Sequence, residues 1–159
     1  MSIWKKYPNY TERELATLTK AASQVLMAGG GDDVAGIGSL FISPRKAARE
    51  VAQLMGSAAP SITPEAVQDL LERAGSSSQL ALQILGMLRE QPELARLIEA
   101  EYVEATKQMT GMETILAAAL LVLVCKITRF KLSKEGVEMS FAPFSGKITS
   151  LLSVLMPKG

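Results

Sequence analysis

The chain has 159 residues, a formal net charge of +1 and an apolar content of 48%. This length is enough for one domain with its own core. The balanced charge gives no electrostatic reason to expect nucleic acid as a partner, because phosphate binders carry a clear basic excess. Histidine is missing and Cys125 is the single cysteine, which excludes an intrachain disulfide and the usual zinc, Ser-His and Cys-His sites. We therefore predict no catalytic residue, no metal and no cofactor, and a protein that is not an enzyme.

Residues 1–10 are expected to form an N-terminal arm. Trp4 stands beside two lysines, a pattern that suits either an anchor at a membrane interface or an arm packed on the body. No apolar run follows these basic residues, as a cleaved secretion signal would require, so a cytoplasmic location is expected.

The helical bundle is predicted to span residues 11–126. Thr11 and Glu14 have the spacing of a capping box and should begin the first helix, which should end at the glycines from Gly29 onward. Its apolar stripe comprises Leu15, Leu18, Ala22, Val25 and Leu26. A phosphate-binding role for the glycine-rich segment 29–38 is disfavoured, because no strand precedes it and two aspartates would repel a phosphate.

Two further helix starts are predicted at Ser43-Pro44 and Thr63-Pro64. In each pair a hydroxyl side chain stands at the cap and a proline at the first helical position. Glycine near Gly56 and Gly75 should end these helices.

A fourth helix is predicted to begin near Ser76 and a fifth at Pro92. In the fifth helix the apolar period continues from Leu94 to Met112. Its acidic cluster, namely Glu99, Glu101 and Glu104, is expected to be a solvated face rather than a metal site, because no histidine completes a carboxylate site.

The segment Ile115–Cys125 contains no polar side chain, which predicts a helix buried on every side. Such a helix would be roughly 16 Å long, whereas the hydrocarbon core of a bilayer is about 30 Å thick. We therefore expect it to form the core of the bundle. Insertion of residues 109–127 into a membrane is the alternative. The residues concerned are Ile115, Leu116, Leu120, Leu121, Val122, Leu123 and Val124.

A β-hairpin is predicted over residues 127–142, because apolar and polar residues alternate on both sides of the turn 133–136. Pairing Leu132 with Val137 places Phe130 opposite Met139. Residues 126–159 hold 6 Lys or Arg against 2 Asp or Glu, so this part of the chain is basic. A short terminal helix is expected over 145–156.

These patterns predict a single domain, residues 1–159, of the mainly α class. It should be a compact bundle of five or six helices with a C-terminal β-hairpin and a short final helix. The function we expect is a non-enzymatic interaction or assembly module that binds a protein partner or further copies of itself, with no nucleic acid. Its candidate contact residues are Leu151, Leu152, Leu155, Arg129 and Lys131. The alternative is a membrane-associated protein that inserts the apolar helix and keeps the basic hairpin at the cytoplasmic face.

Overall fold

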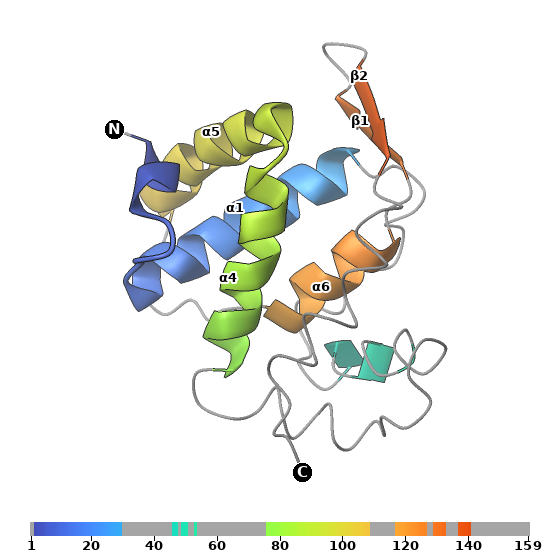
Figure 1. Cartoon of the computed structure of the whole chain (residues 1–159), viewed down its shortest axis with the longest axis horizontal. Coiled ribbons are helices and arrows are strands. Elements are labelled where there is room, and N and C mark those ends of the chain that lie inside the picture. Colours follow the sequence, from blue (N-terminus) through green and yellow to red (C-terminus); the bar gives the residue numbers. More distant parts are fainter. Residues whose placement is uncertain are drawn as a thin grey trace.

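The computed structural model describes residues 2–29, 46, 47, 49, 50, 53, 76–108, 117–126, 129–132 and 137–140. Within these residues the fold is mainly α, as the sequence predicts (Figure 1). The elements are the 3₁₀ helix η1 (Ile3–Lys6), the helices α1 (Glu12–Gly29), α4 (Ser76–Arg89), α5 (Pro92–Gln108) and α6 (Ala117–Lys126), and the strands β1 (Arg129–Leu132) and β2 (Val137–Ser140). Residues 46, 47, 49, 50 and 53 are also helical and fall within the second predicted helix.

The start of α1 is the capping box that the sequence predicts. The backbone N–H of Thr11 donates to Glu14 Oε1 at 3.0 Å, and the N–H of Glu14 donates to Thr11 Oγ1 at 3.1 Å. The first intrahelical bond runs from Leu15 N to Thr11 O at 2.9 Å. Two N–H groups that would lack a helical partner are thereby satisfied, which fixes where the helix begins.

The turn from α4 to α5 is short and held by backbone hydrogen bonds. Gln91 N donates to Leu88 O at 3.1 Å, and Ala95 N donates to Gln91 O at 2.8 Å. Gln91 is therefore the residue that precedes the first helical position, which Pro92 occupies as predicted.

α1 is the element around which the others pack, since it contacts α4, α5, α6 and β1. The sequence predicts one apolar stripe on this helix, but the structure buries a wider surface. The additional buried residues are Ala16, Thr17, Thr19, Ala21 and Ser23. The three hydroxyls in this set donate within the helix, to Arg13 O at 2.8 Å, Leu15 O at 2.7 Å and Thr19 O at 2.8 Å. Small residues with internally satisfied hydroxyls allow neighbouring helices to approach α1 closely without burying an unpaired polar group.

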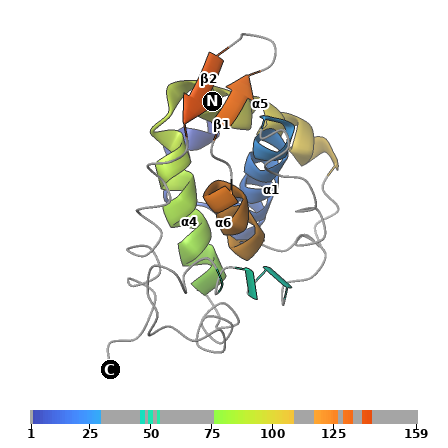
Figure 2. The same ribbon diagram turned by 90° about the vertical axis from the view of Figure 1, so that its right-hand side faces the viewer.

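α6 lies against both α1 and α4, and Figure 2 shows it between them. α6, the most apolar helix among the described residues, therefore has packing partners on more than one side.

The strands β1 and β2 pair antiparallel, with Leu132 opposite Val137 and Phe130 opposite Met139. The turn 133–136 and the predicted terminal helix 145–156 lie outside the described residues. The third predicted helix, from Thr63-Pro64, also falls there, as do Met109 and Met112 at the predicted end of the fifth helix.

Candidate functional site

Five of the seven apolar residues predicted for the core lie on α6 and are shielded from solvent. Leu120, Leu121, Val122 and Leu123 are 0% exposed and Val124 is 2% exposed. Five consecutive residues cover every side of a helix, because each is rotated by about 100° from the last. Burial on every side is therefore a feature of the described part of α6. Ile115 and Leu116 lie outside the described residues.

Only two of the five predicted contact residues of the C-terminal region lie among the described residues. Arg129 and Lys131 belong to β1, where their backbone partners on β2 are Ser140 and Glu138. Leu151, Leu152 and Leu155 lie outside the described residues.

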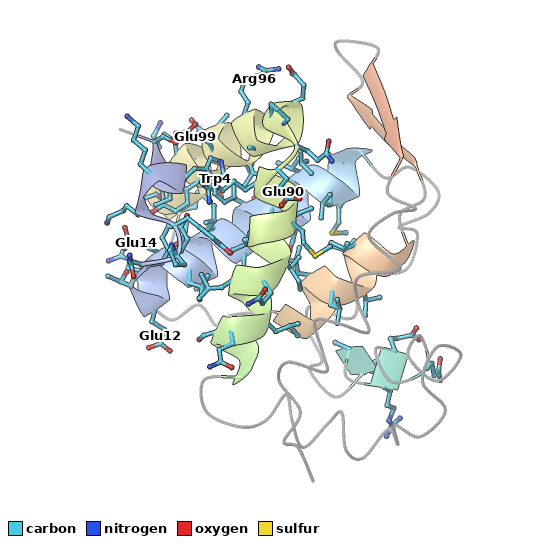
Figure 3. All side chains as sticks on the ribbon, in the orientation of Figure 1. Trp4, Glu12, Glu14, Glu90, Arg96 and Glu99 are labelled. Carbon is cyan, nitrogen blue, oxygen red and sulfur yellow. The ribbon has the colours of Figure 1, made fainter. Side chains whose placement is uncertain are left out.

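The arm, residues 2–10, packs on the helices, which is the second of the two alternatives for Trp4. Ile3 is 7% exposed and Trp4 is 9% exposed. The indole Nε1 of Trp4 donates to Ala95 O on α5 at 2.9 Å (Figure 3). Two residues further along, Lys6 links the arm to α1 through its ion pair with Glu14. The arm is thus joined to the body by apolar burial, by a hydrogen bond of the indole and by a charged contact.

Tyr7 joins the arm to α4. Its Oη donates to Leu82 O at 2.8 Å, and the guanidinium carbon of Arg89 lies 5.0 Å from the centroid of its ring. Burial raises the pKa of Tyr7, and the positive charge of Arg89 opposes that rise. The phenol therefore remains a neutral hydrogen-bond donor at physiological pH.

Tyr10 supports the same end of the arm. Its ring meets the ring of Tyr7 edge-on, with centroids 6.1 Å apart, and its Oη donates to Ile3 O at 3.1 Å. Burial is the largest of the effects that raise the pKa of Tyr10 to about 12. The two tyrosines therefore form an edge-to-face aromatic pair within the arm.

An open depression of about 570 Å³ lies where the arm meets α4. Its lining residues are Tyr7, Gln83, Gly86, Met87, Arg89 and Glu90. Tyr7 of the arm and Arg89 of α4 both line this depression and contact each other. We therefore assign the depression to the packing of the arm on α4.

A candidate contact surface is the outer α5 face, which turns away from the bundle. Its members are all exposed and follow the helical spacing of one face: Glu93, Arg96, Ala100, Val103, Glu104 and Lys107. Val103 is the exposed large hydrophobic residue among those described, at 52%. The opposite side of the helix is buried through Leu94, Ile98 and Ala105. One face of α5 therefore belongs to the core, whereas the other face exposes the apolar residues Ala100 and Val103 to solvent.

Ion pairs stand at both ends of the outer α5 face. Arg96 Nη2 lies 2.9 Å from Glu93 Oε2, and Lys107 Nζ lies 3.3 Å from Glu104 Oε1. Each pair joins residues three positions apart, with the acidic residue first. The apolar residues Ala100 and Val103 therefore lie between two charged pairs along the helix. Arg96, a member of the first pair, is labelled in Figure 3.

Sequence reasoning did not select the outer α5 face as a contact surface. Of the acidic cluster that the sequence predicts to be a solvated face, Glu104 is exposed and belongs to the outer α5 face, whereas Glu99 and Glu101 are half-buried and lie outside it. The exposure of Val103 is visible only in the folded chain. The signal in the sequence was the spacing of charges on either side of Ala100, which has meaning only once these residues are known to share an exposed face.

Among the described residues no group of three or more His, Cys, Asp or Glu side chains is arranged to hold a metal ion. No helix in the described ranges combines the length and the apolar character needed to cross a bilayer. Comparison with known protein families, with curated proteins and with solved structures gave no match.

Proposed function

We propose that this chain is a non-enzymatic assembly module that associates through helix faces, with a protein partner or with further copies of itself. The observation that supports this proposal is the outer α5 face, where Val103 is 52% exposed between two ion pairs. An apolar centre within a polar rim is the usual composition of a contact surface between proteins.

The core of the described residues supports the same proposal. Trp4, α1, α4, α5 and α6 contribute to one cluster of buried residues, so the exposed side of α5 rests on a fixed support. This support lowers the entropy that association costs, because the backbone of α5 is already ordered before contact.

We also propose the finer architecture that the sequence predicts, in which a C-terminal hairpin and a short final helix complete the compact bundle of five or six helices. In that architecture Leu151, Leu152 and Leu155 would form a second apolar face, and Arg129 and Lys131 would supply basic charge near it.

The test is the mass of the full chain in solution as a function of concentration, measured by light scattering. We expect the average mass to rise with concentration and the rise to be weakened by Val103→Asp, because burial of a charge at an apolar contact is costly. Leu151→Asp tests the face on the final helix in the same way. Gln24→Asp is the matched control, because it adds the same charge at an exposed position of α1, away from the outer α5 face.

A chain that remains a monomer at every concentration would contradict self-association. Equal association of the wild type and of both aspartate variants would show that neither face is the contact surface.

The alternative, insertion of residues 109–127 into a membrane, remains a prediction of the sequence. Carbonate extraction at high salt tests it, since an inserted helix stays with the membrane fraction whereas a peripheral or dissolved protein is released.

A further inference from the structure

We propose that the outer α5 face binds the same face of a second copy in antiparallel orientation, with the two-fold axis at Ala100. This inference rests on the proposed function, because it specifies the partner and the geometry of the association. It is carried by the positions of the four charged residues on the face.

An antiparallel pair centred on residue 100 brings Arg96 opposite Glu104 of the second copy, and Glu93 opposite Lys107 of the second copy. The first pair lies about 6 Å and the second about 10 Å from the axis, at 1.5 Å of rise per residue. Both pairs join opposite charges. Because a two-fold interface is self-complementary, each contact occurs twice.

The parallel arrangement is excluded by the same charges. It would place Glu93 against Glu93 and Arg96 against Arg96 of the second copy, and like charges in contact oppose association. The charge pattern therefore selects the antiparallel direction and the register together.

The centre of the face suits close contact of two helices. Ala100 has a small side chain, which allows the two backbones to approach, and Val103 supplies exposed apolar surface one turn away. Positions 93, 96, 100, 103 and 107 alternate by three and four residues, which is the spacing of a helix-pairing seam.

The ion pairs within each copy do not prevent this pairing. The side chains of Arg96 and Glu93 are 56% and 47% exposed, and those of Lys107 and Glu104 are 67% and 62% exposed. Contacts between such exposed charges contribute little to folding. Arg96 has a further interaction within its own copy, and its five N–H donors allow a contact with the second copy in addition. The role of these charges in the dimer is to fix direction and register, and the dimer should weaken as salt concentration rises.

The experiment uses charge reversal in the full chain, followed by sedimentation equilibrium. Arg96→Glu alone and Glu104→Arg alone each place like charges opposite one another across the interface. We expect each to raise the dimer dissociation constant by about tenfold, since two ion pairs are replaced by two repulsive pairs. The double variant Arg96→Glu with Glu104→Arg should restore the wild-type constant. Arg13→Glu, at the exposed start of α1, is the control that should leave the constant unchanged.

Rescue by the double variant cannot arise within one copy. Residues 96 and 104 are eight positions apart, about 12 Å along the helix. Moreover, each reversal creates a like-charge pair inside its own copy, Glu93 with position 96 or Lys107 with position 104, and the double variant keeps both. Only contact between copies is repaired.

A crosslink gives a second readout that does not depend on charge. With Cys125→Ala to remove the natural thiol, Ala100→Cys should form a disulfide-linked dimer on mild oxidation, because the residue on a two-fold axis meets itself. Ala28→Cys, on an exposed position of α1, should not.

The outcomes separate this inference from the proposed function. Restoration by the double variant together with crosslinking at position 100 supports the antiparallel pair. A dimer that forms but shows neither effect overturns it and leaves association through another face. A chain that never forms a dimer overturns both.

Discussion

The hydroxyl of Tyr7 occupies the space that a side chain at position 86 would need. A Cβ on residue 86 would overlap Tyr7 Oη and would lie 3.1 Å from its Cζ. Tyr7 Oη also donates to Leu82 O at 2.8 Å, so the ring cannot withdraw without losing this hydrogen bond. The arm can therefore approach α4 this closely only because residue 86 has no side chain.

Gly86→Ala should for this reason destabilise the protein. In an ordinary helix interior the exchange of glycine for alanine stabilises by about 1 kcal/mol. Here Tyr7 must move, and we expect the free energy of unfolding to fall by about 1 kcal/mol because its hydrogen bond and its contact with Arg89 are weakened. Urea denaturation of the full chain measures the difference.

Tyr7→Phe provides the control for this prediction, because it removes the atom that lies closest to position 86. In a chain that already carries Tyr7→Phe, adding Gly86→Ala should be less costly than in the wild type or should stabilise. Equal effects in the two backgrounds would mean that the hydroxyl and position 86 are not coupled.

Trp4→Phe should lower the free energy of unfolding by about 1 kcal/mol through loss of the hydrogen bond from Nε1 to Ala95 O. Trp4→Ala should cost about 3 kcal/mol or more, because a side chain that is 9% exposed is removed from the core. Lys5→Ala, at an exposed neighbouring position, is the control and should change little. If all three variants unfold alike, the arm does not contribute to stability.

Glu14 should make the stability of the protein sensitive to acid. Its hydrogen bond with the side chain of Lys6, followed by its bond with the backbone N–H of Thr11, holds the pKa of the Glu14 carboxyl below its ordinary value. The unfolded chain, which lacks these contacts, therefore takes up the proton first. The stability that Glu14 contributes is present above pH 4.5, its ordinary value, and is lost as the pH falls through the lower folded pKa.

Glu14→Gln should accordingly cost only about 0.5 kcal/mol at neutral pH, because glutamine keeps the acceptor for the Thr11 N–H and loses only the ion pair with Lys6. It should also reduce the loss of stability in acid. Thermal or urea unfolding at neutral and acidic pH measures both effects. Glu12→Gln, an exposed change in the same first turn, should leave the acid dependence nearly intact. An unchanged acid dependence in Glu14→Gln would assign it to other carboxylates.

The two valines at positions 122 and 103 offer a matched test of burial. Val122 is 0% exposed on α6 and Val103 is 52% exposed on α5. Val122→Ala should lower the free energy of unfolding by about 2 kcal/mol, because two methyl groups are lost from the core. Val103→Ala should have almost no effect on a dilute monomer, since alanine has the higher helix propensity. Similar costs at both sites would contradict the burial of α6.

The sequence by itself determined those features that depend on neighbouring residues. The capping box of Thr11 and Glu14 and the start of α5 at Pro92 are local, because the groups that satisfy the backbone are three or four positions apart. The mainly α class follows from the same local signals. The all-round apolar character of α6 also predicted its burial, since no orientation of such a helix exposes a polar side.

Only the tertiary structure decided which surfaces meet and which remain free. The sequence allowed two roles for Trp4, and the choice depended on Ala95, which is distant in the chain and offers its carbonyl oxygen to the indole. The stripe predicted for α1 was narrower than the surface that the structure buries, because alanine, serine and threonine do not reveal from sequence whether other helices pack on them. The same reason applies to α5. The charges around Ala100 can be read from the sequence, but the packing of α5 against α1 and α4 decides whether their face is buried or exposed.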